Sequence, residues 1–260
     1  MKVAILGCGA IGSVVAHAIH DGKVPGAELV GVVHAEPTDP PGLPVLGIES
    51  ATARADLIVE CAGQRALAAL GPSIVAAGTD LLVVSIGALA DDALLAELRD
   101  TGPGKLHLCS GAIGGLDVLA ATARMRGLDA VRIVTTKKAP TLIQNWMDEP
   151  AAQRLRTTTE PVQLMRAPAR EVTAAFPASA NVAAAVALAV GDWNLVEATV
   201  VADPDAPHTS HVIAAEGSAG HYRFEIRNHP SASNPATSGM VPHAVLAAVA
   251  RLAAPTGAFA

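Results

Sequence analysis

The first hundred residues alternate short apolar runs, rich in branched side chains, with amphipathic stretches rich in alanine and leucine. This alternation is typical of right-handed β-α-β units that build a parallel sheet. It predicts strands at residues 3–6, 29–33, 57–60, 81–85 and 106–109. Between them it predicts helices at residues 11–19, 65–77 and 91–98. The proline-rich stretch 34–44 is expected to be a loop.

The pattern changes after residue 110, where the glycine-rich turn SGAIGGLD precedes a helix at 116–125 and a strand at 131–136. A buried helix is expected at 181–190, and strands follow at 197–201, 211–216 and 221–227. Gly217 and Gly220 indicate a hairpin between the last two strands. Strands that follow one another without helices predict antiparallel pairing, so this half is expected to be an α+β domain.

The predicted fold class is therefore α/β, with a Rossmann-type, doubly wound parallel sheet in one domain. The second, α+β domain is expected to contain a mixed or antiparallel sheet. We expect the dinucleotide-binding domain at residues 1–109 together with a C-terminal helix within 236–260, and the second domain at 110–235.

Composition narrows the classes of partner. Aromatic residues make up only 2% of the 260 residues and the net charge is −6, so base stacking and attraction to phosphate backbones are both weak, and nucleic acid is not an expected partner. The apolar stretch 182–190 is too short to span a membrane, and the first residues lack a signal-peptide pattern. The three cysteines lack metal-ligand spacing. We expect a cytoplasmic protein with a small-molecule substrate, no membrane contact and no metal.

Three glycines interrupt the apolar run at the start of the chain, MKVAILGCGAIGSVVAHAI. Gly7, Gly9 and Gly12 form a G-x-G-x-x-G pattern between the first predicted strand and the first predicted helix. In that context the first glycine permits a tight turn, the second lets the backbone approach a pyrophosphate, and the third allows close helix packing. The pattern predicts a dinucleotide site formed by Gly7, Gly9, Ala10, Ile11 and Gly12, with a structural turn or another nucleotide as alternatives.

The choice between NAD and NADP is open. His34 ends the second predicted strand, where an NAD-binding protein usually carries an acidic residue for the ribose. Glu36 could reach the ribose instead, a protonated His34 could accept a 2′-phosphate, or His34 could be a solvated loop residue. Further cofactor contacts are expected where the third and fourth strands end, with ordinary loops as the alternative. They are Cys61, Ala62, Ser85 and Gly87.

Six segments resemble the L-aspartate dehydrogenase family in order and spacing. They are VVSIGAL (83–89), SGAIGGLD (110–117), VTTKKAP (134–140), FPASANVAAAVALA (176–189), HTSHVIAAEG (208–217) and FEIRNHPSASNPATS (224–238). The resemblance implies oxidation of L-aspartate to iminosuccinate with NAD or NADP, hydrolysis to oxaloacetate and ammonia, and the reverse amination. It also implies a homodimer assembled through the open sheet of the second domain. The family usually has an acidic residue where His34 stands, so a strict NAD preference is not implied.

The matching motifs also imply roles for single residues. Ala112 and Asn181 would contact the cofactor, and His211 would be the catalytic histidine; we prefer His211 to His208 because its distance to the following Glu-Gly turn matches the family. A histidine that titrates near neutrality could accept the proton of the substrate ammonium group or activate water.

A dicarboxylate substrate also needs positive charge, for which Lys137 and Lys138 are candidates, with a solvated basic turn as the alternative.

Other functions compete with this interpretation. A homoserine or aspartate-semialdehyde type of oxidoreductase would share the two-domain plan, and semialdehyde oxidation would need a nucleophilic cysteine, for which Cys109 is the candidate. The substrate could also be another small amino acid or imine, because a fold and a cofactor site do not specify the acid that is oxidised. A non-catalytic dinucleotide sensor is the alternative from a different class.

Overall fold

The structure is a computed structural model that describes the chain except residues 35–41, 178, 232–233, 235–236 and 255–260. Most of the predicted 34–44 loop, including Glu36, thus lies outside the described residues. The chain divides into two compact units. Unit 1 consists of Met1–Gly111 with Val241–Ala260, and unit 2 of Ala112–Met240.

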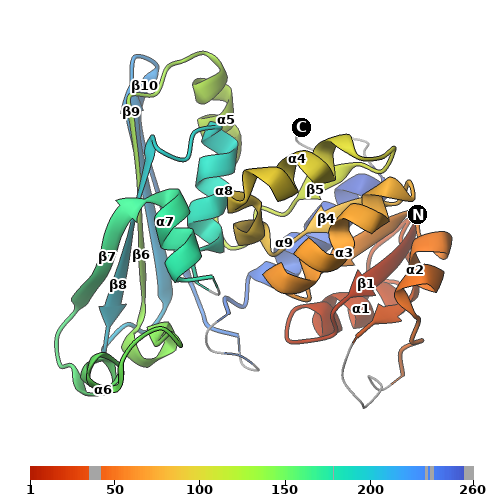
Figure 1. Cartoon of the computed structure of the whole chain (residues 1–260), viewed down its shortest axis with the longest axis horizontal. Helices are drawn as coiled ribbons and strands as arrows, with labels where there is room; N and C mark the ends of the chain where they lie inside the picture. Colours follow the sequence, from red (N-terminus) through yellow and green to blue (C-terminus); the bar gives the residue numbers. More distant parts are fainter. Residues whose placement is uncertain (35–41, 178, 232–233, 235–236, 255–260) are drawn as a thin grey trace. The chain divides into compact units, whose positions relative to one another are not determined.

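Unit 1 is built on a five-stranded sheet whose neighbouring strands all run parallel (Figure 1). Its strands are β1 (Lys2–Leu6), β2 (Glu28–Val33), β3 (Leu57–Glu60), β4 (Asp80–Val83) and β5 (Leu106–Leu108). Their order is β2-β1-β3-β4-β5, so the chain runs from β1 to one side and returns to β3 on the other. The carboxyl ends of β1 and β3 therefore flank the point where open α/β sheets bind ligands.

Helices cover both faces of this sheet, because its strands are apolar on both sides. On one face α1 (Gly12–His20) and α9 (Val241–Ala253) pack over a cluster that includes Leu82. The neighbouring Leu81 points to the opposite face and lies near Gly71 of α3 (Gln64–Ala76), which packs against α4 (Asp92–Asp100). This doubly wound arrangement confirms the predicted fold class. The remaining helices of unit 1 are α2 (Ile48–Arg54) and the 3-10 turn η1 (Ile86–Ala90).

Unit 2 is built on a mixed five-stranded sheet, in agreement with the predicted α+β class. Its strands are β6 (Ala130–Lys138), β7 (Val162–Pro168), β8 (Val196–Asp203), β9 (Thr209–Gly217) and β10 (Gly220–Asn228), in the order β10-β9-β6-β8-β7. Strands β6 and β8 pair in parallel, and the other pairs are antiparallel. The predicted hairpin is present, with Gly217 opposite Gly220.

One face of the unit 2 sheet is covered by α5 (Leu116–Arg124), α7 (Ala169–Ala175) and α8 (Asn181–Val190), as Figure 1 shows. The 3-10 turn η2 (Ala139–Leu142) and α6 (Glu149–Thr157) complete the unit. Side chains of β6 alternate between a buried set on the helix-covered face and a partly buried or exposed set on the other face. No described helix covers that second face, which we call the open face. Among the described residues, no helix is long and apolar enough to cross a membrane.

Candidate functional site

The turn between β1 and α1 contains three glycines. At two of them a larger side chain would clash with neighbouring atoms, and at the third it would not. Gly7 has φ +93°, and a Cβ there would lie 2.6 Å from Cα of Ala62. A Cβ on Gly12 would overlap the carbonyl oxygen of Gly7. A Cβ on Gly9 would meet no described atom within 4 Å. The surface in front of Gly9 is therefore open to a ligand that approaches the backbone closely, as a pyrophosphate does.

The start of α1 fits the same ligand. Its N-cap residue, Ile11, offers no side chain that accepts a hydrogen bond, and the first turn contains no acidic residue. Helix N-termini carry N–H groups without intrahelical partners and a positive partial charge, which together favour a phosphate. Ala10 and Ile11, both predicted cofactor contacts, form the turn that leads into this helix.

A cavity of about 460 Å³ opens beside the glycine turn. Five predicted cofactor residues line it, namely Gly7, Gly9, His34, Cys61 and Ala62. The sequence analysis did not identify the apolar residues that complete the wall, among them Ile48, Ala66 and Leu70. A mostly apolar cavity with a few polar groups and a helix N-terminus suits an adenine nucleotide.

Glu60, which the sequence analysis also missed, connects the two loops that follow β3 and β4. Its carboxylate is fully buried and accepts hydrogen bonds from the backbone N–H groups of Ala62 and Gly63 at 2.8 Å. It also accepts bonds from the backbone N–H and the hydroxyl of Ser85, both at 2.9 Å. Burial raises the pKa of Glu60, and these bonds oppose the rise.

The structure therefore places Ser85 where it holds this carboxylate, and Gly87 in the buried turn η1. Neither residue lines the cavity beside the glycine turn. Of the two, only Ser85 supports the wall of the cavity, through the carboxylate of Glu60 that also holds the loop after β3.

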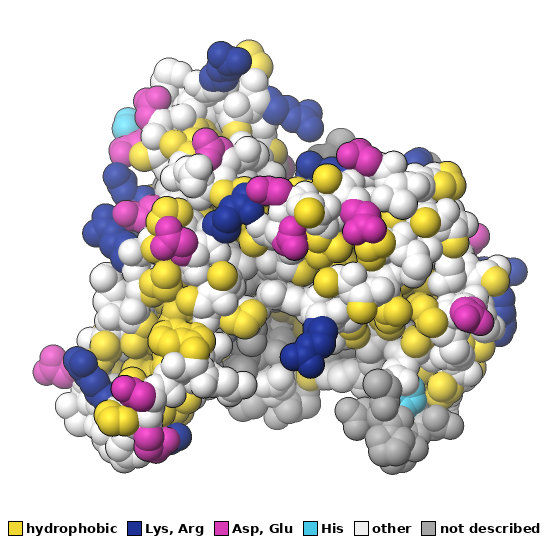
Figure 2. All heavy atoms as spheres, viewed as in Figure 1, with side chains coloured by type: hydrophobic (Ala, Val, Ile, Leu, Met, Phe, Trp, Pro, Cys, Tyr) yellow, Lys and Arg dark blue, Asp and Glu magenta, His cyan; other side chains and the backbone are white. Residues whose placement is uncertain are grey.

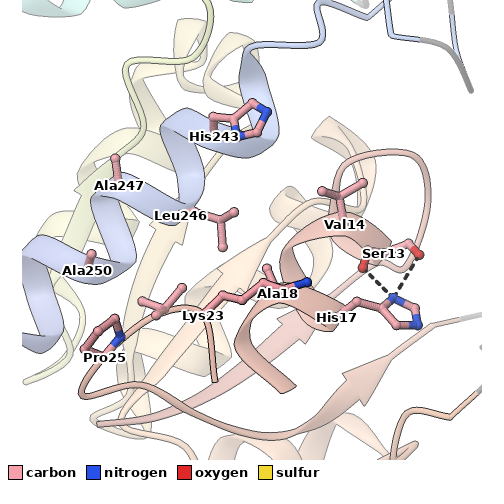
Figure 3. Close-up of a pocket in the computed structure, with 11 residues that line it drawn as sticks. Ser13, Val14, His17, Ala18, Lys23, Pro25, His243, Leu246, Ala247 and Ala250 are labelled. Carbon is pink, nitrogen blue, oxygen red and sulfur yellow. Dashed lines mark hydrogen bonds between the residues drawn. The ribbon is translucent and has the colours of Figure 1, made fainter. Parts of the chain in front are cut away.

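A second cavity of unit 1, about 730 Å³ in volume, lies between α1 and α9 (Figure 3). Leu246 and other apolar side chains line most of it. Its polar side chains are engaged locally: Nδ1 of His17 donates to the carbonyl of Ser13 at 2.8 Å, and Lys23 pairs with Asp21 at 2.8 Å. None of the three motif glycines lines this cavity, so it is separate from the candidate nucleotide site.

His211 lies near the start of β9 in unit 2, on the helix-covered face of the strand, and is 2% exposed. It pairs in register with Thr135 of β6, and Nδ1 of the imidazole lies 3.0 Å from the Thr135 hydroxyl. Burial lowers the pKa of His211 to about 3, and the charge of Lys137 contributes to this. At neutral pH the side chain is therefore a neutral imidazole with one ring nitrogen engaged by Thr135.

Lys137 follows Thr135 by two residues and so lies on the same face of β6. It is 6% exposed, and burial lowers its pKa to about 8. Lys138 is exposed and lies on the open face. The structure therefore brings Lys137 together with Thr135 and His211, and it does not bring Lys138 to them. The period of two in a strand could have separated the two lysines and pointed to Thr135.

Ala112 is hydrogen-bonded to the end of the unit 2 sheet at which β9 begins. Its carbonyl accepts a hydrogen bond of 2.8 Å from the side-chain amide of Asn228, which pairs with Thr209, two residues before His211. Asn181 begins α8, which packs against the helix α5 that follows Ala112. Among the described residues, no group of three or more His, Cys, Asp or Glu side chains is placed to hold a metal ion.

Comparison with known proteins connects both units to one family. Residues 117–252 match the family described as aspartate dehydrogenase, C-terminal, and residues 7–104 match the NAD-binding domain of homoserine dehydrogenase. A protein of Ruegeria pomeroyi named L-aspartate dehydrogenase is 39% identical, over 96% of this chain and 91% of its own. One of Methanopyrus kandleri with the same name is 35% identical, over 97% and 96%.

The fold agrees with these relatives. The crystal structure of an aspartate dehydrogenase from Thermotoga maritima superimposes with a TM-score of 0.77 at 25% identity, covering 100% of this chain and 99% of that one.

Proposed function

The chain belongs to the L-aspartate dehydrogenase family, and on that premise we propose that it oxidises L-aspartate to iminosuccinate with NAD or NADP. Iminosuccinate then hydrolyses to oxaloacetate and ammonia, and the reverse direction is a reductive amination. The observation that carries this proposal is the 39% identity over 96% of the chain to a relative named for that activity. The neutral, buried His211 in unit 2 supports it, because hydrolysis of the imine needs a group that accepts a proton from water.

The nicotinamide coenzyme, when bound, supplies the hydride acceptor. In this proposal the backbone at Gly9 and the start of α1 hold its pyrophosphate, because a Cβ on Gly9 would point into open space and α1 begins without a side-chain cap. The cavity lined by His34 and Cys61 holds its nucleoside. Ala112 and Asn181, which the family motifs imply as cofactor contacts, keep that role in the proposal.

His211 is proposed as the residue that activates water for hydrolysis of the imine. A neutral imidazole has one lone pair available to accept a proton, and the hydrogen bond to Thr135 fixes the ring so that Nε2 is the free position for this work. Of the two predicted substrate lysines, only Lys137 shares the face of His211, so it alone is part of the proposed site.

The thiol-dependent alternative fits the structure less well. Cys109 is 1% exposed, and burial raises the pKa of its thiol. A nucleophilic cysteine needs the opposite, an accessible side chain with a lowered pKa. We therefore propose an amino-acid dehydrogenase rather than a semialdehyde dehydrogenase.

We also propose that the protein is a homodimer formed through the open face of unit 2. This face carries charges of both signs that already pair on it, such as Arg166 with Glu197 at 2.9 Å and Arg227 with Glu225 at 2.7 Å. Figure 2 shows basic and acidic side chains interspersed over unit 2. A surface of mixed charge can be self-complementary about a two-fold axis. Light scattering should give twice the chain mass, and Val212→Lys, at the centre of the open face, should give the monomer.

The activity is tested by following the absorbance of reduced nicotinamide with a panel of amino acids, NAD and NADP. The proposal expects turnover with L-aspartate, and reductive amination of oxaloacetate with ammonia. In His211→Asn, kcat should fall by a factor of about 10²–10⁴ while coenzyme binding is retained. Turnover with another amino acid and none with aspartate would refute the proposed substrate, and full activity of His211→Asn would refute the proposed role of the histidine.

A further inference from the structure

A third cavity, about 280 Å³ in volume, lies in unit 2 beside α6 and the edge strand β7. The half-buried side chains of Met147, Val162 and Leu164 belong to its apolar wall. A cavity of about 150 Å³ is sufficient for benzene. This one can therefore hold an aromatic ring together with a short polar chain. The proposed function does not use it.

The indole of Trp146 lines this cavity and is held in a fixed position although it is 61% exposed. Its N–H donates a hydrogen bond of 2.7 Å to the carbonyl of Ala175. Its ring meets the fully buried ring of Phe176 edge to face, with the ring centroids 5.8 Å apart. Because the indole is already ordered, a second ring that packs against it gains an aromatic contact without the entropy cost of fixing the side chain.

Arg154 gives the cavity a positive charge that the protein leaves uncompensated. Ala151, Arg154 and Leu155 lie three and four residues apart on α6, so they share one helix face, and all three line the cavity. Among the described residues, no carboxylate forms an ion pair with Arg154, whereas Arg156 of the same helix pairs with Glu149 at 2.6 Å. A guanidinium group can bind a carboxylate through two parallel N–H donors.

These walls select for a particular chemistry. No acidic side chain is among the described residues that line the cavity, and its other polar side chain is the neutral amide of Gln163. The ligand that matches has one carboxylate for Arg154 and an apolar, aromatic body for Trp146. L-aspartate matches poorly, because its ammonium group and second carboxylate would lose their hydration against apolar side chains.

We propose that this cavity is a second ligand site, which binds a small aromatic monocarboxylate between Arg154 and Trp146. The inference goes beyond the proposed function, because it concerns another class of ligand and residues other than those assigned to aspartate oxidation. Its test measures binding and not enzyme activity, so it stands or fails separately from the proposed function.

The experiment titrates phenylacetate into the isotope-labelled protein and follows the indole N–H signals of the two tryptophans, Trp146 and Trp193, by nuclear magnetic resonance. The variant Trp146→Phe identifies the signal of Trp146. We expect this signal to shift saturably with a Kd on the order of 1 mM, as is typical of a ligand of this size. The signal of Trp193, which does not line the cavity, should not shift.

Variants and related ligands test the two contacts. Arg154→Gln should raise the Kd for phenylacetate about tenfold or more, because a charge-assisted hydrogen bond is lost. The Kd for the neutral phenylacetamide, which is already weak in the parent, should stay the same in this variant. Arg156→Gln is the matched control, since Arg156 lies on the same helix outside the cavity, and it should bind phenylacetate like the parent. L-aspartate should leave the Trp146 signal unchanged.

Three results would overturn the inference. One is the absence of a saturable shift of the Trp146 signal up to about ten times the expected Kd. Another is an equal loss of phenylacetate affinity in Arg154→Gln and Arg156→Gln, or no loss in either, because the guanidinium of Arg154 would then have no specific role. The third is binding of L-aspartate at Trp146 as tightly as phenylacetate, which would refute the class of ligand.

Discussion

The buried Lys137 is predicted to destabilise unit 2, so replacing it by methionine should raise the free energy of unfolding of that unit. The side chain is 6% exposed, and burial lowers its pKa from 10.5 to about 8. Each pKa unit corresponds to about 1.4 kcal/mol, so keeping this lysine charged at neutral pH costs the folded state about 3 kcal/mol. Methionine has a similar length and no charge to desolvate. Lys137→Met should therefore raise the free energy of unfolding at neutral pH by about 1–3 kcal/mol.

The sign of the pH dependence follows from the same values. Because the pKa of the folded state is lower than that of the unfolded chain, the unfolded chain binds more protons between pH about 8 and 10.5. The stability of the parent therefore rises with pH across that window. The advantage of Lys137→Met should be complete below pH about 8 and should shrink as the pH approaches 10.5.

Unit 2 provides its own spectroscopic probe, because both tryptophans of the chain, Trp146 and Trp193, belong to it. Urea titrations followed by tryptophan fluorescence, at neutral pH and again near the upper end of the window, measure the difference. Lys138→Met is the matched control, since Lys138 is exposed on the open face and should change stability by less than about 0.5 kcal/mol. A Lys137→Met variant less stable than the parent, or one whose advantage does not shrink with pH, would refute this reasoning.

Three further predictions concern unit 1. Glu60→Gln should destabilise unit 1 by about 1–3 kcal/mol and weaken coenzyme binding, because an amide cannot accept all four hydrogen bonds of the carboxylate. A urea titration followed by circular dichroism measures the stability, and unchanged stability and affinity would contradict the role given to this carboxylate. Gly9→Ala should keep the stability of the parent but raise the Kd for reduced coenzyme about tenfold or more, whereas Gly12→Ala should also lower the stability. Equal losses of stability in the two variants would contradict an open surface at Gly9. Coenzyme should slow the alkylation of Cys8 by a maleimide several-fold, as followed by mass spectrometry of the labelled peptide, and unprotected labelling would place the nucleotide elsewhere.

The fold of unit 1 could be predicted because its information is local. Alternating strands and helices appear directly in the apolar pattern, and the spacing of Gly7, Gly9 and Gly12 between a strand and a helix indicates the turn. Helix α2 and strand β7 were missed because IESATAR and VQLMRAP have little apolar periodicity, so tertiary packing determines them.

The site could be predicted only in part, because much of it depends on contacts between distant segments. Glu60 binds Ser85, 25 residues away, and Thr135 contacts His211, 76 residues away. No local sequence pattern predicts either of these contacts. The positions of the two lysines, by contrast, could be predicted from the sequence. Successive side chains of a strand point to opposite faces, which places Lys137 and Lys138 on different faces of β6.

The proposed function requires transfer of the Cα hydrogen of an amino acid to a coenzyme held at the glycine turn. The most direct test is a single turnover with L-aspartate deuterated at Cα, followed by magnetic resonance of the recovered coenzyme. The parent should give deuterium on the nicotinamide ring, and Gly9→Ala should give much less transfer in the same time. His211→Asn should still transfer deuterium in a single turnover, because His211 is proposed to act on water after the hydride has left. Recovery of the coenzyme without deuterium from the parent enzyme would contradict it.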